Sequence, residues 1–281
     1  MVKSNKFFDL IKLLRINNAL IGGFGVFVSY LLVKFNLKDF RLYLGIFSVF
    51  FVMFAGNIIN DIFDLETDRI NKPQRPLVKS KFNIKFIYFI YFLFSILSFF
   101  ISFFLSFRLF LVVFFSTVLL YFYSYKLKRI PFLGNFIISL LSGLLFIFGS
   151  EIAGDISKGV FPALFAFFMT LGREILKDIE DVNGDKYIGR RTLPIVLGEE
   201  NSLFVAIVVF IILIILTFIP YLLGIYNKLY MLVAFFGVDL ILIVLLLIFY
   251  IFNDLKTKRV VNSLIKYDML IGLFAIFLGG K

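Results

Sequence analysis

Long apolar stretches follow one another along the whole of this chain, and they constrain its fold more than any other feature. Several run close to or beyond the roughly 18 apolar residues that a membrane-spanning helix needs. The 281 residues are 61% hydrophobic and include 42 Phe, which is more apolar surface than a soluble domain of this length could cover. The sequence therefore predicts an all-α, polytopic membrane protein with one transmembrane domain over residues 1–281.

We expect about nine transmembrane helices around a central cavity. Their predicted spans are 16–34, 42–60, 86–107, 109–125, 132–152, 160–178, 202–220, 229–252 and 267–280. The last span is short, so eight spans followed by a re-entrant tail remain an alternative. The N-terminal stretch 3–15 is basic and amphipathic and has no small-residue cleavage site, so we interpret it as an interfacial lead-in and not as a removed signal.

The distribution of basic residues predicts the orientation in the cell membrane. With a cytoplasmic N-terminus, the inner side collects 22 of the 29 Lys and Arg residues, as the positive-inside rule requires. This orientation places loops 61–85 and 179–201 on the cytoplasmic face. We attribute the net charge of +11 to basic residues in these cytoplasmic loops and to basic residues that bind anionic phosphates. We expect no nucleic-acid partner.

The chain contains no Cys, His or Trp. This composition excludes disulfides, thiolate or imidazole metal sites, haem ligation through these residues, and Cys or His nucleophiles. Any bound metal must be held by oxygen ligands.

Nine of the eighteen acidic residues lie in two short segments, 61–68 and 174–185. Two sets of four polar residues, in these segments and just before the first of them, have the same spacing of four, three and four positions. This spacing places each set on one face of a helix. The second set lies 117 residues after the first. The sets are Asn57, Asp61, Asp64 and Asp68, and Glu174, Asp178, Asp181 and Asp185. The repeat predicts an internal duplication of four-helix units, roughly 16–125 and 132–252, and an even number of intervening spans lets the two acidic ends face each other.

Like charges on one helical stripe repel each other, and charge near a membrane is costly without a function. A cation is therefore implied. Magnesium prefers one or two carboxylates together with substrate phosphates, so two facing acidic stripes predict a diphosphate bridged by metal. The alternative is that these are solvated helix ends paired with Lys and Arg, which explains the charge but not the repeated spacing.

These motifs resemble those of the UbiA-type intramembrane aromatic and lipid prenyltransferases, and the resemblance covers essentially the whole chain. The first family signature, an Asn-rich helix end of the form NxxxDxxxD, is matched by Asn57, Asn60, Asp61, Asp64 and Asp68. The loop DRINKPQRPL follows it. The second, DxxxD, is matched by Asp181 and Asp185, with Asp178 one turn earlier. The segment YSYKLKR also looks like a family feature. REILKDIEDVNGD followed by GRRTLP is most similar to the archaeal branch that makes digeranylgeranylglyceryl phosphate.

The resemblance implies a catalytic site that uses two Mg²⁺ ions on the donor diphosphate. One ion is expected on Asn60, Asp61, Asp64 and Asp68, and the other on Asp178, Asp181 and Asp185; these six aspartates are the predicted catalytic residues. Further substrate-binding residues are expected around them. They are Asn57 and Glu174 as supporting or acceptor-side groups, Lys72 and Arg75 as a diphosphate clamp, Tyr121, Tyr125 and Lys126 near the diphosphate or the allylic cation, and Arg173 and Lys177 for an acceptor phosphate.

The implied activity is transfer of a geranylgeranyl group from its diphosphate to the free hydroxyl of geranylgeranylglyceryl phosphate, with the site facing the cytoplasm. The expected partners are this prenyl diphosphate donor, a lipid-like phosphorylated acceptor and the bilayer, without an obligate protein partner. Prenylation of an aromatic acceptor, as in quinone or haem side-chain synthesis, stays open. A cation transporter fits less well, because transporter sites lie near the bilayer midplane, and a scaffolding protein gives no reason for the acidic stripes.

Overall fold

The computed structural model describes residues 6–187, 189–252 and 254–280, and Lys3 of the predicted lead-in lies outside them. The described residues form helices joined by short loops, without strands. Nine helical segments among them are long and apolar enough to cross a membrane. The all-helical, nine-span prediction is confirmed.

The long helices are α2 (Ile16–Val33), α3 (Phe40–Phe63), α6 (Ile84–Leu105), α7 (Phe107–Tyr125), α8 (Leu133–Ala153), α9 (Val160–Glu180), α12 (Glu199–Leu222) and α15 (Leu255–Gly279). The eighth span is composite: α13 (Lys228–Ala234) continues through a π-helical turn, Phe235–Asp239, into α14 (Leu240–Ile251). Short helices complete the chain. They are α1 (Lys6–Leu14), α4 (Leu65–Asn71), α5 (Pro76–Lys79), α10 (Val182–Tyr187), α11 (Leu193–Leu197) and the 3₁₀ turns Leu127–Arg129 and Ile156–Gly159.

Helix starts follow the capping residues of the sequence. Asp39, Asn83 and Ser106 each precede a long helix, and each side chain accepts a hydrogen bond from a backbone N–H of the first turn. These bonds satisfy donors that have no partner within the helix.

The last span differs from its prediction. Helix α15 begins at Leu255 and not at 267, so the stretch 255–266, which precedes the predicted last span, is helical. Its polar residues have partners on neighbouring helices: Lys258 Nζ lies 3.0 Å from Glu199 Oε2, and Asn262 Nδ2 donates to Glu180 Oε2 at 2.7 Å. With 25 residues, this helix is long enough to span, and the re-entrant alternative is wrong.

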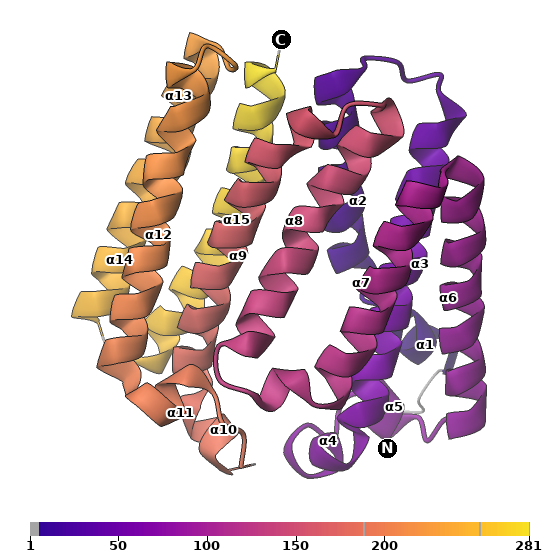
Figure 1. Cartoon of the computed structure of the whole chain (residues 1–281). Coiled ribbons are helices and arrows are strands. Elements are labelled where there is room, and N and C mark those ends of the chain that lie inside the picture. Colours follow the sequence, from indigo (N-terminus) through magenta and orange to yellow (C-terminus); the bar gives the residue numbers. More distant parts are fainter. Residues whose placement is uncertain (1–5, 188, 253, 281) are drawn as a thin grey trace.

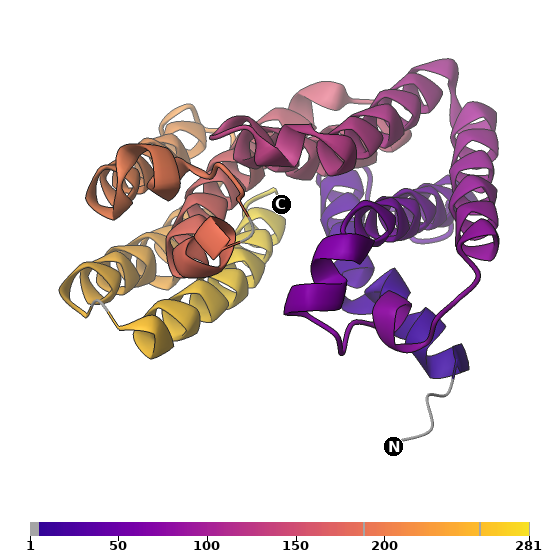
Figure 2. The ribbon, with the colours of Figure 1, turned by 90° about the horizontal axis from the view of Figure 1, so that it is seen from below.

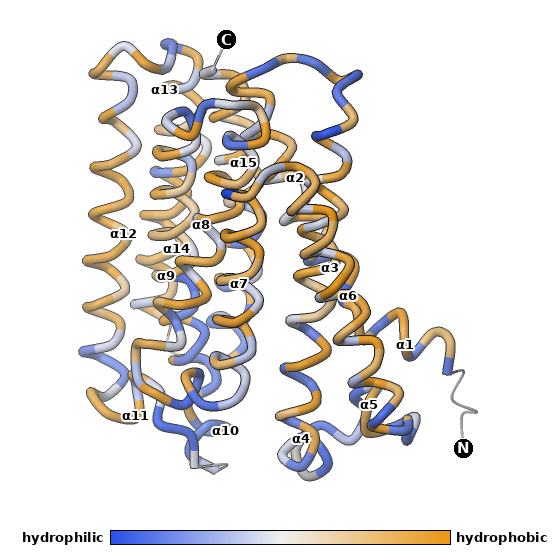
Figure 3. The backbone as a smooth tube through the Cα atoms, turned by 45° about the vertical axis from the view of Figure 1, so that its right-hand side comes forward, coloured by the Kyte–Doolittle hydropathy of each residue, from blue (hydrophilic) through white to orange (hydrophobic). Residues whose placement is uncertain are grey.

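Five of the short helices gather at one end of the bundle. Helices α1, α4, α5, α10 and α11 lie there, whereas α15 ends at the opposite end (Figure 1). Viewed from the end with the short helices, the indigo-to-purple helices form one side and the orange-to-yellow helices form the other (Figure 2). Hydrophilic residues gather at this end, below predominantly apolar spans, and a smaller hydrophilic stretch lies in the loop between α2 and α3 at the opposite end (Figure 3). The polar end is where the chain can build a site for a charged ligand.

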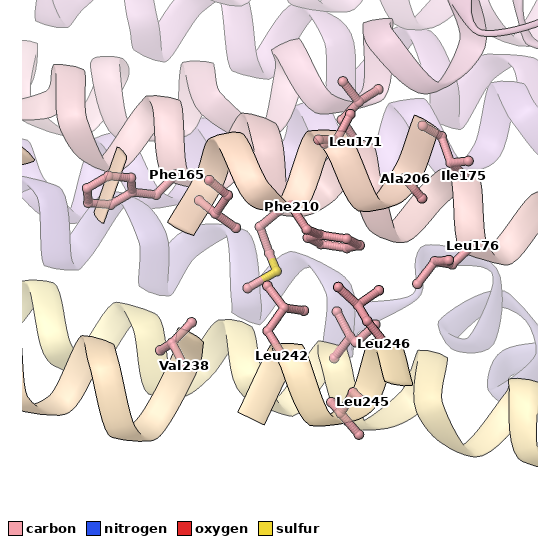
Figure 4. Close-up of a cluster of buried hydrophobic side chains, with 14 of the residues drawn as sticks. Phe165, Leu171, Ile175, Leu176, Ala206, Phe210, Val238, Leu242, Leu245 and Leu246 are labelled. Atoms are coloured by element: carbon pink, nitrogen blue, oxygen red, sulfur yellow. The ribbon is translucent and has the colours of Figure 1, made fainter. Parts of the chain in front are cut away.

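The second half has its own apolar core between α9, α12 and α14. Phe210 lies at its centre among Leu171, Leu176 and Leu242 (Figure 4). Helix α12 approaches α9 at Gly172, where an added Cβ would lie 2.5 Å from Cζ of Phe210. Glycine at this position therefore sets the packing of the helix that carries the second acidic set.

Helices α2 and α8 form a close seam between the two halves. Ser29 Oγ donates to the carbonyl oxygen of Phe146 at 2.5 Å, and an added Cβ at Gly149 would lie 2.5 Å from the carbonyl oxygen of Val26. Ser29 and Phe146 are 117 positions apart, the same offset that relates the acidic sets. We propose on this basis that residues 16–125 and 132–252 are related units.

Candidate active site

Helices α3 and α9 both end at an aspartate. Asp64 follows α3 with φ −89° and ψ −2°, and Asp181 follows α9 with φ −90° and ψ 2°. The chain then turns into α4 and α10, which carry Asp68 and Asp185. All four acids line one cavity of about 1150 Å³. The structure thus brings the two acidic ends together around a common space.

Asp64 is surrounded by nitrogen donors. Lys128 Nζ lies 2.7 Å from Asp64 Oδ1 and donates to Asn60 Oδ1 at 3.0 Å. Asn60 Nδ2 in turn donates to Asp64 Oδ2 at 3.2 Å, and Arg190 Nη2 lies 3.6 Å from Asp64 Oδ1. The first acidic end is therefore neutralised by cations of the protein itself.

Arg75 holds the other two acids of this end. Its Nη1 lies 2.6 Å from Asp68 Oδ2 and 3.5 Å from Asp61 Oδ1, and Asp61 also pairs with Arg15. Asp68 lines the cavity, whereas Asp61 is only 2% exposed and lies behind the wall. Arg75 Nη1 thus joins Asp61 to Asp68, and the two arginine contacts of Asp61 both use its Oδ1. The role of Asp61 as a metal ligand stays a prediction.

The second acidic end has fewer cations. Asp178 Oδ2 accepts a hydrogen bond from Asn135 Nδ2 at 2.9 Å, and Arg190 Nη1 lies 3.4 Å from Asp185 Oδ1. Asp181 is exposed, and its carboxylate has neither an ion pair nor a side-chain hydrogen bond within the described part of the chain. Arg190 pairs with an acid of each end and so bridges them.

Burial shifts the protonation of groups on the loops around this cavity. It raises the pKa of the carboxyls of Asp68 and Asp185, although Arg75 and Arg190 beside them act in the opposite direction. Burial also lowers the pKa of the Lys128 ammonium, against the attraction of Asp64. Charge is poorly solvated here, so a bound cation would relieve the carboxylates and a bound anion would relieve the lysine.

The remaining predicted residues divide into two groups. Asn57, Lys72, Glu174 and Lys177 line the cavity. Arg173 does not; its Nη1 lies 2.9 Å from Glu174 Oε1, and Lys177 Nζ lies 3.2 Å from Glu174 Oε2.

Tyr121, Tyr125 and Lys126 are exposed and lie outside the cavity wall. Both tyrosine rings pack on Phe63, with ring centroids 5.5 Å away in each case. Tyr123, two positions from each of them, lines the cavity instead. Tyr121 and Tyr125 therefore do not reach the cavity in this structure, because a helix points neighbouring side chains in different directions. Their contact with substrate stays a prediction.

Deeper in the bundle the cavity wall becomes apolar. It is formed by side chains of α3, α7 and α8, among them Val49, Val52, Met53, Val112, Val113, Leu145 and Phe148. A ligand that fits both parts has an anionic head at the acidic ends and a hydrocarbon chain between these helices.

The donor set suits Mg²⁺. The available ligands are carboxylate and amide oxygens, and within the described residues no group of three acids is arranged to hold a metal alone. Mg²⁺ commonly takes one or two carboxylates and completes its shell with substrate phosphates and water. The residues therefore fit a metal that binds together with a diphosphate.

The family model of the UbiA prenyltransferases matches residues 23–270. This chain belongs to the UbiA prenyltransferase family. Two relatives named digeranylgeranylglyceryl phosphate synthase are each 38% identical to it: that of Methanosphaera stadtmanae over 209 residues, or 74% of this chain and 75% of the relative, and that of Methanocaldococcus jannaschii over 221 residues, or 75% of each.

Solved structures of the family share the fold. One, from work on digeranylgeranylglyceryl phosphate synthase in membranes, matches with a TM-score of 0.84 and 32% identity over 99% of both chains. A UbiA homologue from Archaeoglobus fulgidus bound to GPP and Mg²⁺ matches with a TM-score of 0.67 and 21% identity over 94% of this chain and 99% of that one.

Sequence reasoning missed four residues of this family member's site as direct partners of the acids: Arg15, Lys128, Asn135 and Arg190. Asn135 lies 117 positions after Asn18, which also lines the cavity, so the repeat offset could have indicated it. The three cations lie in basic segments where the sequence does not distinguish site residues from positive-inside charge.

Proposed function

We propose that this chain is a Mg²⁺-dependent prenyltransferase that transfers a geranylgeranyl group from geranylgeranyl diphosphate to the free hydroxyl of geranylgeranylglyceryl phosphate. The product is an ether-linked membrane lipid precursor. The observation that carries the proposal is the single cavity whose head is lined by both acidic ends and whose depth is apolar. The names of the relatives at 38% identity support the choice of substrates.

The ligands proposed for the metal are the acids and the amide on the cavity wall. Asn60, Asp64 and Asp68 would hold one ion, and Asp178, Asp181 and Asp185 the other. Bound Mg²⁺ supplies Lewis-acid neutralisation of the charge that develops on the departing diphosphate.

The cations of the site bind the same diphosphate. Arg75, Lys128 and Arg190 line the cavity and are paired with acids there. With metal on the acids, these side chains would be released from their ion pairs and could donate to phosphate oxygens, for which Arg offers a bidentate fork. The apolar wall around Met53, Leu145 and Phe148 holds the prenyl chain and keeps water from the allylic carbon until the acceptor hydroxyl attacks.

The acceptor brings its own phosphate, and Lys177 is the cation we assign to it. Lys177 lines the cavity one turn before Asp181, whereas Arg173 is off the wall and contacts Glu174. In the membrane, we propose that the acidic ends face the cytoplasm with α1, as the excess of Lys and Arg at this end supports.

The test is a transfer assay with the purified chain in lipid, with geranylgeranyl diphosphate as donor and mass spectrometry of the product. The phosphorylated glyceryl ether and a hydroxybenzoate are offered separately and together. We expect product from the glyceryl ether alone, and only with Mg²⁺. Preferential use of the hydroxybenzoate would replace the acceptor assignment with aromatic prenylation, and the absence of transfer to either would overturn the proposal.

A further inference from the structure

The chain breaks its first span at Arg15. This residue has φ 52° and ψ 53°, a left-handed conformation, and it separates α1 from α2. A non-glycine residue adopts this conformation at a cost in free energy and retains it only where the surroundings enforce it. The contacts that hold this break also fix the position of the Arg15 side chain.

Two residues of α3 hold the break. Asn57 Nδ2 donates to the carbonyl oxygen of Leu14 at 2.9 Å, and Asp61, one turn later on the same face, accepts a hydrogen bond from Arg15 Nη2. Helix α1 is fixed from its other side as well. Asp9 is buried and accepts a hydrogen bond from Ser80 Oγ at the end of α5, and Leu13 is fully buried.

Burial distinguishes the two members of the Arg15–Asp61 ion pair. The side chain of Asp61 is 3% exposed and lies behind the cavity wall, whereas that of Arg15 is 34% exposed and lines the cavity. The hydrogen bond to Asp61 uses Arg15 Nη2 alone, and a guanidinium has five N–H donors in a planar fork. Arg15 therefore keeps donors for a ligand while it stays bonded to Asp61.

The cavity region that Arg15 reaches already contains diphosphate-binding candidates. Arg75 pairs with the same carboxylate oxygen, Asp61 Oδ1, so one buried acid orients two arginines toward the cavity. A buried carboxylate with two arginine partners on the wall is arranged as a support for those arginines. Its Oδ1 is occupied by these two arginines, which favours a supporting role over metal ligation.

We infer, on the basis of the proposed function, that Arg15 is an additional binding residue for the donor diphosphate, and that Asn57 and Asp61 are positioning residues that hold it on the cavity wall. Helix α1 thus delivers a substrate contact to the site and is more than an interfacial lead-in. Asp61 acts through its two arginines, in contrast to Asp64 and Asp68, which reach the cavity directly.

The kinetic test compares Arg15→Gln, Asp61→Asn and the double variant with wild type. Lys12→Gln is the matched control, because Lys12 is an exposed cation on α1, three positions before Arg15, and does not line the cavity. We expect Arg15→Gln to raise the KM of the donor about tenfold to a hundredfold, as for loss of a charge-assisted hydrogen bond, with the KM of the acceptor unchanged. Asp61→Asn should act in the same direction and at least as strongly, because Asp61 also pairs with Arg75. The double variant should be no more impaired than Asp61→Asn, since both changes remove the Arg15–Asp61 contact.

Metal dependence separates a positioning role from ligation. The Mg²⁺ concentration for half-maximal activity should be unchanged in Asp61→Asn. A tenfold rise in that concentration with an unchanged donor KM would return Asp61 to the metal ligands. A donor KM for Arg15→Gln equal to that of Lys12→Gln would remove Arg15 from the donor site.

A binding measurement without turnover gives the second readout. A non-reactive thiodiphosphate analogue of the donor is titrated into each protein in EDTA, and Arg15→Gln should bind it about tenfold more weakly than Lys12→Gln does. Wild-type protein that binds the analogue but transfers nothing would refute the proposed function and still test Arg15. If Asp61→Asn does not fold, Asn57→Ala combined with Arg15→Gln repeats the non-additivity test, and fully additive losses would overturn the positioning role.

Discussion

The acidic ends of α3 and α9 have matching backbone geometry and different neighbours. Their capping aspartates, Asp64 and Asp181, have φ and ψ values within a few degrees of each other. Asp64 nevertheless lies against Lys128 and Arg190, whereas Asp181 is exposed and, among the described residues, has no ion pair. One end is already neutralised by the protein, and the other is ready for an external cation.

The repeated acidic motif therefore need not have the same role at the two ends. At the first end, metal binding must displace ammonium and guanidinium groups from carboxylates, which leaves these cations free for the diphosphate. At the second end, Asp178 has only the neutral amide of Asn135 as its side-chain partner in the described structure. We therefore expect the second end to bind metal first and the first end to bind metal and diphosphate together.

The largest expected effect comes from removing one acid at each end. Asp64→Ala and Asp181→Ala should each lower kcat by at least about 10²–10³, the usual cost of losing one group that stabilises a developing oxyanion. Initial rates at saturating Mg²⁺ measure this. Glu66→Ala is the control, because Glu66 lies in the same acidic segment but is exposed and pairs only with Arg69. Full activity of either aspartate variant in excess EDTA would refute metal binding at these ends.

Replacing the cation at the first end should make the two ends more alike. Lys128→Met removes the ammonium that lies 2.7 Å from Asp64, so metal affinity at this end should rise about tenfold, while the donor KM also rises about tenfold. Mn²⁺ titration followed by electron paramagnetic resonance measures the first quantity, and kinetics measure the second. Lys126→Met, an exposed neighbour outside the cavity, should change neither. Unchanged Mn²⁺ affinity in Lys128→Met would show that cations do not distinguish the two ends.

The acceptor side of the second end should show a smaller effect. Removing the phosphate from the acceptor should raise its KM, and Lys177→Ala should lose most of this discrimination, about tenfold for one charge-assisted contact. Arg173→Ala should lose less, because Arg173 is off the cavity wall. The comparison uses phosphorylated and dephosphorylated acceptor with each protein. Equal discrimination in all three would place the acceptor phosphate elsewhere.

The smallest effect is expected near the first end but outside its cavity. Tyr121→Phe and Tyr125→Phe should leave kcat and both KM values within about twofold, since surface changes of this kind alter free energies little. Tyr123→Phe, which alters a hydroxyl on the cavity wall, is the matched comparison. A tenfold loss in Tyr121→Phe would restore the predicted substrate contact.

The spans and the acidic ends could be predicted because each depends on local pattern. The length of an apolar stretch indicates a membrane-spanning helix, and the spacing of residues along a helix determines which of them share a face. The start of α15 could not be read in this way, because Lys258 and Asn262 resemble loop residues until their partners, Glu199 and Glu180, are known. Tertiary contacts supplied the information that the local pattern lacked.

The roles of individual charges depended still more on tertiary structure. Asp61 belongs to the same stripe as Asp64 and Asp68, and only the approach of Arg15 and Arg75 shows that it faces a different environment. Lys126 and Lys128 are two positions apart in one basic segment, yet only Lys128 reaches the acids. No sequence pattern separates such neighbours, because their directions are set by the turn Leu127–Arg129, which contains Lys128 and follows Lys126.

The close seam between α2 and α8 has a consequence for the motions of the two halves during turnover. At Gly149 the backbone of one helix touches the carbonyl oxygen of Val26 on the other, and Ser29 bonds the two across the same crossing. Sliding of α2 along α8 would bring side chains against the backbone at Gly149, and spreading would break the Ser29–Phe146 hydrogen bond. We therefore expect the two halves to stay together at this crossing, and the motions that admit substrates and release diphosphate to occur in the short helices at the polar end.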